Sequence, residues 1–201
     1  TRTSPYPVFS ADYLPLYTNA DEVTPGMLLA ASSAVSAFEE SDVTVENNGS
    51  MTGGAAAYGD SAVLNMTVNG TWNGTVKSAE ASQSTSTVSL FRVLAAAVSQ
   101  ASAVGVDLTL GSTGNWNVPA DASVRNLALA GGTVTFPTPA DTASFTGTTV
   151  TVTGDYASDG GTLVMNTVLA GDGSASDKLA VEGSTSGTTK VKIQNVGGAG
   201  A

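Results

Sequence analysis

The sequence of 201 residues contains no cysteine and no histidine. Without these residues the chain can form no disulfide, no zinc site built on cysteine or histidine, and no Ser-His-Asp or Cys-His arrangement. Imidazole, the side chain that most often serves as a general base near neutral pH, is missing as well. We therefore expect no catalytic residues, no metal site and no cofactor in this chain.

Positive charge is scarce too. Seven Lys and Arg residues stand against seventeen Asp and Glu residues, which gives a formal net charge of -10. An acidic surface repels phosphate backbones and anionic lipid head groups, so we expect no binding to nucleic acid or to membrane surfaces. Charged residues make up only 12% of the chain, against roughly 25% in typical soluble domains. This balance favours a β-rich, extracellular or surface-displayed protein.

The sequence also lacks a long apolar run. Its most apolar stretch, residues 88–108, carries Arg92 and Gln100. It falls short of the roughly 20 predominantly apolar residues that cross a bilayer, so we expect no membrane insertion. The spacing of its apolar residues fits a helix as well as two inward-facing strands. The chain begins at Thr1 without a signal peptide, and we expect it to be a piece of a longer protein.

Short β-strand patterns separated by turn residues are abundant. Apolar residues alternate with Thr, Asn, Ala or Lys, and Gly or Asn follows each pattern. From Leu108 to Leu127 is 19 residues and from Leu163 to Leu179 is 16. A period of about 16 to 21 residues is the length of one coil of a β-solenoid. The patterns lie at residues 43–45, 64–68, 108–110, 127–129, 150–152, 163–165, 179–181 and 191–193.

A stack of parallel coils explains this pattern. One coil cannot bury its own apolar side chains, but coils stacked about 4.8 Å apart bury them in a continuous column. We therefore predict an all-β parallel β-helix with Val, Leu, Ile and Met inside and Thr, Ser, Asn and Lys outside. A sandwich of hairpins is the competing architecture, but it favours tight turns about every 8 to 12 residues.

The first 42 residues do not follow the repeat. A short helix is predicted over residues 24–40, because Thr24 can cap it and Pro25 suits its first position. The segment before it holds four of the ten Phe and Tyr residues of the chain, which could contact a partner or cover an apolar flank of the rod. These residues are Tyr6, Phe9, Tyr13 and Tyr17.

Two other groups of residues leave a chemical alternative open. Trp72 and Trp116 could stack on a sugar, although packing within the coils is the favoured interpretation. Four aspartates near glycines could bind calcium, but the repeat G-G-x-G-x-D is absent. Solvation at the corners of the coils is therefore favoured for Asp155, Asp159, Asp172 and Asp177.

The C-terminal sequence resembles a known family. The stretch "GDGSASDKLAVEGSTSGTTKVKIQNVGGAGA" (residues 171–201), with its Ser-x-Ser-Asp-Lys-Leu motif, is similar to the end of the passenger region of pertactin-like autotransporters. These are Gram-negative proteins of type V secretion. The stretch "GNWNVPADASVRNLALAGGTVTFP" (residues 114–137) is similar to the family's Trp-containing coil, followed by a strand, a Gly-rich corner and another strand. The resemblance covers about residues 114–201.

The resemblance implies a right-handed parallel β-helix whose last coils act as an autochaperone. Such a region folds first at the cell surface and templates the coils upstream. We accordingly divide the chain into a non-repetitive segment (1–42), β-helix coils (43–125) and an autochaperone region (126–201). The resemblance also implies exposure at the surface of a Gram-negative bacterium, or secretion, and a β-barrel translocator of the same polypeptide as partner.

Within the last region we expect the most cleanly alternating apolar residues to form the folding nucleus. Large inward side chains bury more apolar surface, at roughly 25 cal/mol per Å². Lys190 and Lys192 are predicted to point outward, where charge discourages aggregation of an unfinished stack. Residues 183–189 are predicted to form a loop over the open end of the column. The expected nucleus is Leu163, Met165, Leu179, Val181, Val191 and Ile193.

Three functions stay open for the protein that contains this chain. The first is a non-enzymatic stem and autochaperone of a surface-exposed adhesin or other virulence factor, which binds a host surface protein or glycan. The second is the stem of a secreted autotransporter protease whose catalytic domain lies upstream. The third is a carbohydrate-active β-helix enzyme, although no acidic set with a basic partner stands out in the repeats.

Overall fold

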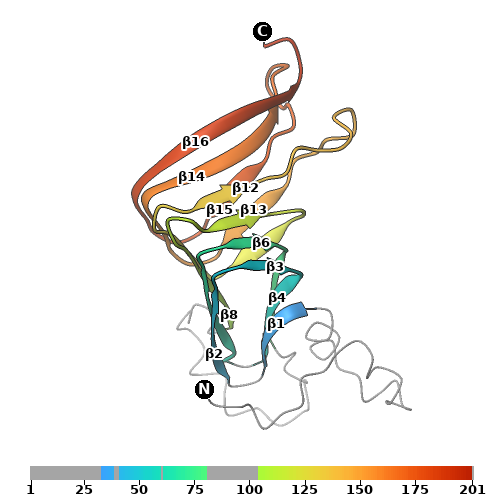
Figure 1. Cartoon of the computed structure of the whole chain (residues 1–201). Coiled ribbons are helices and arrows are strands. Elements are labelled where there is room, and N and C mark those ends of the chain that lie inside the picture. Colours follow the sequence, from blue (N-terminus) through green and yellow to red (C-terminus); the bar gives the residue numbers. More distant parts are fainter. Residues whose placement is uncertain (1–32, 39–40, 60, 81–103, 201) are drawn as a thin grey trace, which may run out of the picture.

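A computed structural model shows the chain as a stack of parallel β-coils (Figure 1). The structure describes residues 33–38, 41–59, 61–80 and 104–200. The coils follow one another along the rod, from β2 at one end to β16 at the other. Among these residues all regular elements are strands, and the named strands pair in parallel. The prediction of an all-β parallel β-helix is confirmed.

The strands form three faces, and each coil contributes to each face in turn. The first face contains β2 (Asp42–Asn47), β5 (Val63–Val68), β8 (Gly105–Leu110) and β11 (Asn126–Leu129). The second contains β3 (Ser50–Thr52), β6 (Thr71–Asn73), β9 (Asn115–Asn117) and β12 (Thr133–Thr135). The third contains β1 (Ser33–Phe38), β4 (Gly54–Gly59), β7 (Val76–Glu80), β10 (Ala122–Val124), β13 (Thr149–Val152) and β15 (Lys178–Val181).

The two longest strands, β14 (Tyr156–Val168) and β16 (Thr185–Gly197), run continuously from the first face into the second, where the upstream coils have a corner between two short strands. β14 pairs with β11 through its first residues and with β12 further along. β16 then pairs with β14 along nearly its whole length. The C-terminal coils therefore present one continuous bent strand where the upstream coils have two short ones.

The core is a column in which each inward side chain lies beside its counterpart in the next coil. Met51, Trp72, Trp116, Val134 and Leu163 follow one another in register along the second face. Alternate burial in β5 and β11 shows the period of two that a half-buried strand requires. The apolar residues predicted to face inward in these strands are buried.

Trp72 and Trp116 are both fully buried in this column. Their rings stack with centroids 5.3 Å apart and planes inclined by 9°. Each indole N–H donates to a carbonyl of a neighbouring coil: Trp72 to Gly53 at 2.8 Å and Trp116 to Gly74 at 2.9 Å. Packing within the coils is therefore confirmed, and neither ring is available to stack on a sugar.

Coil length differs between the two halves of the stack. A hydrogen bond joins Asn69 to Asn48, 21 residues earlier, and another joins Asn126 to Asp107, 19 residues earlier. In the C-terminal half, the bond between Asp155 and Asn126 spans 29 residues. The predicted period holds from β2 to β5 and from β8 to β11, but it is wrong between β5 and β8, where Leu64 pairs with Val106. It is also wrong for the last coils, where Leu163 pairs with Val191 rather than with Leu179. Inserted loops after β12 and after β14 lengthen these coils.

Two predictions of secondary structure are wrong. Residues 33–38 of the predicted helix form β1, because pairing with β4 overrides the local helical spacing. The rest of that helix lies outside the described residues. Most of the predicted loop 183–189 belongs to β16, where Thr-rich sequence pairs with β14. In the ambiguous stretch 88–108, residues 105–108 are strand and most of the remainder is not described.

The described part of the chain contains no helix of the length and hydropathy that a membrane crossing requires.

A glycine at the coil corner supports the tryptophan stack. A Cβ at Gly74 would lie 2.0 Å from the Gly53 carbonyl oxygen and 2.6 Å from Trp72 Nε1. We expect Gly74→Ala to lower the free energy of unfolding by about 1–3 kcal/mol, because the neighbouring coils must separate. Denaturant unfolding followed by tryptophan fluorescence measures this change. The control is Gly49→Ala, whose added methyl meets nothing within 4 Å; equal stability of the two variants would contradict the prediction.

Candidate functional site

At the C-terminal end of the stack, β16 pairs with β14 on one side and is followed by no further strand among the residues that the structure describes (Figure 1). Val191 is 54% exposed and Ile193 is 56% exposed, although they continue the rows of Leu163 and Met165 in register. Leu169, 42% exposed, lies just after β14. Val191 and Ile193 have no described coil on one side, so the last strand presents apolar side chains to solvent.

The six residues predicted as the folding nucleus lie on three strands, β14, β15 and β16. Leu163 belongs to the buried core, and Met165, Leu179 and Val181 pack against it while remaining partly exposed. Val191 and Ile193 are more than half exposed. Burial within this group therefore decreases toward the end of the stack. The aromatic residues proposed for partner contact, Tyr6, Phe9, Tyr13 and Tyr17, lie outside the described residues.

A buried polar cluster joins the last coils. Asp177 is only 3% exposed, and its Oδ1 accepts a hydrogen bond from the Thr148 N–H at 2.8 Å. Its Oδ2 accepts from the backbone N–H of Asn166 at 2.7 Å and from Asn166 Nδ2 at 2.8 Å. The same Nδ2 donates to the carbonyls of Phe136 and Pro137 at 3.0 and 3.1 Å. We call these five residues the Asp177 bracket.

The bracket fixes the points at which two loops leave and rejoin the stack. Phe136 and Pro137 follow β12, and Thr148 directly precedes β13, so one loop is closed between them. Asn166 lies near the end of β14 and Asp177 directly precedes β15, so the second loop is closed as well. One carboxylate thus sets the geometry of both insertions that lengthen the C-terminal coils.

Solvation at a corner is therefore the wrong interpretation for Asp177. A buried carboxylate is tolerated when charge-assisted hydrogen bonds replace its water, and three donors do so here. Sequence reasoning missed this role because the donors lie 11 and 29 residues away. One feature of the sequence does indicate a special role for Asp177, which is its position in the Ser-x-Ser-Asp-Lys-Leu motif. Among the described residues no group of three acidic side chains lies close enough to hold a metal ion.

Other polar side chains connect successive coils at the corners. Asn126 Oδ1 accepts from the Asp155 N–H, and Asp155 Oδ1 in turn accepts from the Ser184 N–H, both at 2.9 Å. On the last strand, the hydroxyls of Tyr156 and Thr189 lie 2.6 Å apart. The contacts of Asn126 and Asp155 supply partners for backbone N–H groups that the coil corners leave outside the ladders.

An ion pair connects β8 with the start of β11. Arg125 Nε donates to Asp107 Oδ1 at 2.7 Å, and Arg125 Nη2 donates to Asp107 Oδ2. Asn126 Nδ2 donates to the same carboxylate at 2.9 Å. Both charged side chains are about one quarter exposed, at 24% and 25%. The hydrogen bond to Asp107 raises the pKa of Arg125 and outweighs the opposite effect of its partial burial.

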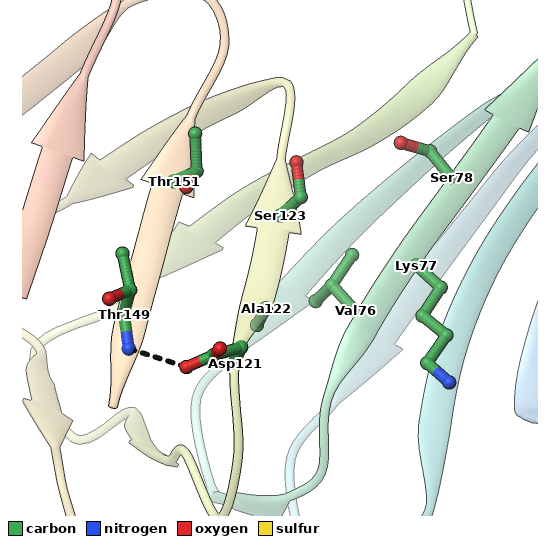
Figure 2. A pocket seen from close by; sticks show the side chains of 8 residues that line it. All are labelled: Val76, Lys77, Ser78, Asp121, Ala122, Ser123, Thr149 and Thr151. Carbon is green, nitrogen blue, oxygen red and sulfur yellow. Dashed lines mark hydrogen bonds between the residues drawn. The ribbon is translucent and has the colours of Figure 1, made fainter. Parts of the chain in front are cut away.

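The third face is interrupted between β7 and β10, which belong to separate hydrogen-bonded sheets. Figure 2 shows an open groove at this place, with a volume of about 540 Å³. Asp121 is the single carboxylate of its lining, and it accepts the N–H of Thr149 at 2.8 Å. Glycoside hydrolysis commonly needs a pair of carboxyl groups. The described residues of the lining lack this pair. It is lined by Val76, Lys77, Ser78, Asp121, Ala122, Ser123, Thr149 and Thr151.

Comparison with protein families gives one match. Residues 122–201 match the family described as Autochaperone Domain Type 1. The match begins at Ala122, the first residue of β10, where the third face is interrupted. It includes every residue of the Asp177 bracket and all strands from β10 to β16.

Curated relatives match parts of the same chain. The BrkA autotransporter of Bordetella pertussis is 38% identical over 91 residues, which cover 45% of this chain and 8% of that protein. The probable autotransporter YfaL of Escherichia coli is 46% identical over 54 residues, which cover 27% of this chain and 4% of that protein. The uncharacterized E. coli protein YdeU is 44% identical over 55 residues.

This chain spans between 4% and 12% of the length of the curated relatives that it matches. No solved structure matches it significantly.

The Asp177 bracket predicts a graded loss of stability. Asp177→Ala removes the acceptor of three hydrogen bonds and leaves buried donors unpaired, so we expect a loss of about 2–3 kcal/mol in the free energy of unfolding. Asp177→Asn keeps one acceptor oxygen, and its effect should be smaller. Denaturant unfolding followed by far-ultraviolet circular dichroism measures both. Asp172→Ala, at an exposed loop position, is the control; a loss no larger than the control's would refute the structural role of the bracket.

Proposed function

We propose that this chain, an autotransporter passenger stem whose residues 122–201 form an autochaperone domain, folds from its C-terminal coils toward its upstream coils. Passengers of this kind are exported by Gram-negative bacteria to the cell surface or are secreted. The matched domain is structural rather than catalytic. We accordingly propose a non-enzymatic role for the chain, as folding template and stem.

The observation that carries the proposal is that the contacts of the Asp177 bracket are self-contained. All five residues lie within 122–201, and so do both partners of the long β14–β16 pairing. These contacts can form before any upstream coil is in place. Coils that lie upstream then add to β11 and β12, whose edges offer a preformed ladder. Each added coil closes its ladder on an ordered strand, and the entropy cost of forming a new nucleus is avoided.

We propose that the six apolar residues form the folding nucleus of this domain and that they contribute unequally to its stability. Leu163, Met165, Leu179 and Val181 contact the core and contribute by burial. Val191 and Ile193 bury less of their surface and contribute mainly by extending the column. The division into residues 1–42, 43–125 and 126–201 is part of the same proposal. Neither boundary coincides with a break in the structure or in the family match. Strand β1, in the first part, pairs with β4, in the second part, and the family match begins at residue 122 rather than 126.

For the whole protein we propose a surface-exposed adhesin or other virulence factor. Its partners would be a β-barrel translocator of the same polypeptide and a host surface protein or glycan, with the N-terminal aromatic residues as candidate contacts. The second candidate is the stem of a secreted autotransporter protease, and a catalytic motif in the sequence upstream of Thr1 would distinguish it. A carbohydrate-active enzyme is disfavoured because the groove between β7 and β10 has one carboxylate.

Charge placed in the proposed nucleus tests the folding role. We expect Leu179→Asp and Val181→Asp to reduce surface display of the passenger by about tenfold, because a buried carboxylate without partners is expensive in an apolar column. Ile193→Asp should have a smaller effect. Flow cytometry of intact cells with an antibody to the passenger measures display. The matched control is Ala180→Asp, because Ala180 is an exposed neighbour on the same strand.

Display of Leu179→Asp and Val181→Asp at the level of Ala180→Asp would contradict the nucleus assignment. Total passenger in whole-cell extracts, measured in parallel, separates a folding defect from reduced synthesis.

A further inference from the structure

The junction between the autochaperone domain and the first upstream coil has an ambiguous apolar pattern. On the first face, β8 pairs with β11, with Asp107 beside Asn126 and Leu108 beside Leu127. Every inward residue of β8 is Val or Leu, and β11 contributes only Leu. A slip of one residue would turn all of these side chains outward, so burial forbids it. A slip of two residues keeps each of them inside, and burial does not forbid it.

The polar contacts at this junction do distinguish the two registers. Asp107 accepts hydrogen bonds from Arg125 Nε, Arg125 Nη2 and Asn126 Nδ2 in the observed register. A forked guanidinium–carboxylate contact requires a defined position of both groups. After a slip of two residues, either Gly105 or Thr109 would stand beside Asn126. Neither has a carboxylate, so the charge of Arg125 would lose this partner.

Gly105 adds a steric condition to the same alignment. A Cβ at this glycine would lie 2.7 Å from the Cβ of Arg125, so the backbone of β8 has room for Arg125 only where a glycine stands. The residues two positions away in the sequence are Ala103 and Asp107, and both have a Cβ. A slip of two residues in either direction would therefore place a side chain against Arg125.

We propose that Asp107, Arg125 and Asn126, which we call the register clasp, select the alignment in which the first upstream coil joins the autochaperone domain. The proposal rests on the proposed function, since it assumes that β11 is ordered before β8 arrives. These are positioning residues: the apolar column drives the addition of the coil, and the register clasp decides among the alignments that keep the apolar side chains of β8 and β11 inside. Arg125 and Asn126 belong to the matched domain, whereas Asp107 belongs to the coil that it receives.

A neutral contact crosses the same junction on the second face. Thr135 Oγ1 donates to Asn115 Oδ1 at 2.9 Å. Bonds between neutral groups are weaker than charge-assisted ones, and a hydroxyl rotates to suit its acceptor. Upstream, Asn69 Nδ2, just after β5, donates to Glu46 Oε1 of β2 at 3.2 Å, at an exposed position. That contact resembles the register clasp in chemistry but lies outside the junction, and it provides a control.

Engineered cysteines can report the register directly, because the chain has no cysteine of its own. Thr109 and Ala128 are paired neighbours on β8 and β11, so the pair T109C/A128C forms a disulfide in the observed register. Adjacent strands are about 4.8 Å apart, within the range that a disulfide bridges. The pair T109C/A130C reports a slip of two residues. In the observed register its second cysteine lies roughly 6.6 Å farther along the strand, beyond that range.

The experiment refolds the complete chain from denaturant, oxidises it, and measures the yield of each disulfide by non-reducing electrophoresis and mass spectrometry. With the clasp intact, the T109C/A128C disulfide should predominate. Asp107→Asn should lower the ratio of observed to slipped disulfide by roughly five- to tenfold, as expected for loss of a partly exposed charged contact. Arg125→Lys, which keeps the charge but loses the fork, should give an intermediate ratio. Glu46→Gln should leave the ratio unchanged.

A charge-reversed pair distinguishes register selection from a general structural role. D107R/R125D should recover part of the ratio that either single change loses, whereas residues that only fill space give no such recovery. An unchanged ratio in both Asp107→Asn and Arg125→Lys would overturn the proposal. If Asp107→Asn does not fold, as judged by circular dichroism, the ratio in Arg125→Lys decides.

Pulse proteolysis during refolding tests the underlying order of folding separately. Protection of residues 122–201 before residues 105–117 supports the proposed function. Simultaneous protection contradicts the proposed function, while the disulfide ratio still reports whether the clasp sets the register.

Discussion

Stacking of identical strand positions is the constraint on which the rest of this structure depends. In a parallel coil an inward side chain is buried by the side chains at the same position in the coils on either side, because each coil contacts only its neighbours. Trp72 against Trp116 shows the constraint satisfied, with two full-size rings in contact and each indole N–H bonded to an adjacent coil. Val191 and Ile193 show it unsatisfied at the end of the stack.

The polar groups also depend on the neighbouring coil, which supplies their hydrogen-bond partners. Where a loop interrupts the ladder, backbone N–H groups need new acceptors, and side chains of the neighbouring coil supply them. Asn126 and Asp155 do so at exposed corners, and Asp177 does so within the core. The difference in burial follows from the loops, since Asp177 closes two insertions that cover it. The longer C-terminal coils are thus held by hydrogen bonds as much as by apolar contacts.

A repeating apolar pattern also creates a problem of alignment, because a shift of two residues leaves burial intact. The chain has few cations to resolve it, with seven Lys and Arg in total. Arg125 lies near the start of the stretch that matches the autochaperone family, next to β11, which pairs with β8. If the coils add in the proposed order, a single charged contact at that position constrains the alignment of every coil added afterwards.

The sequence alone determined the all-β parallel coil, because alternation of apolar and polar residues and recurrent Gly and Asn are local signals. It also indicated the burial of both tryptophans and, through the C-terminal resemblance, the autochaperone region. Only the tertiary structure decided that residues 33–38 are a strand, that the last coils need 29 residues, and that Asp177 is buried. These features depend on partners one coil away, and spacing within a strand carries no information about such partners.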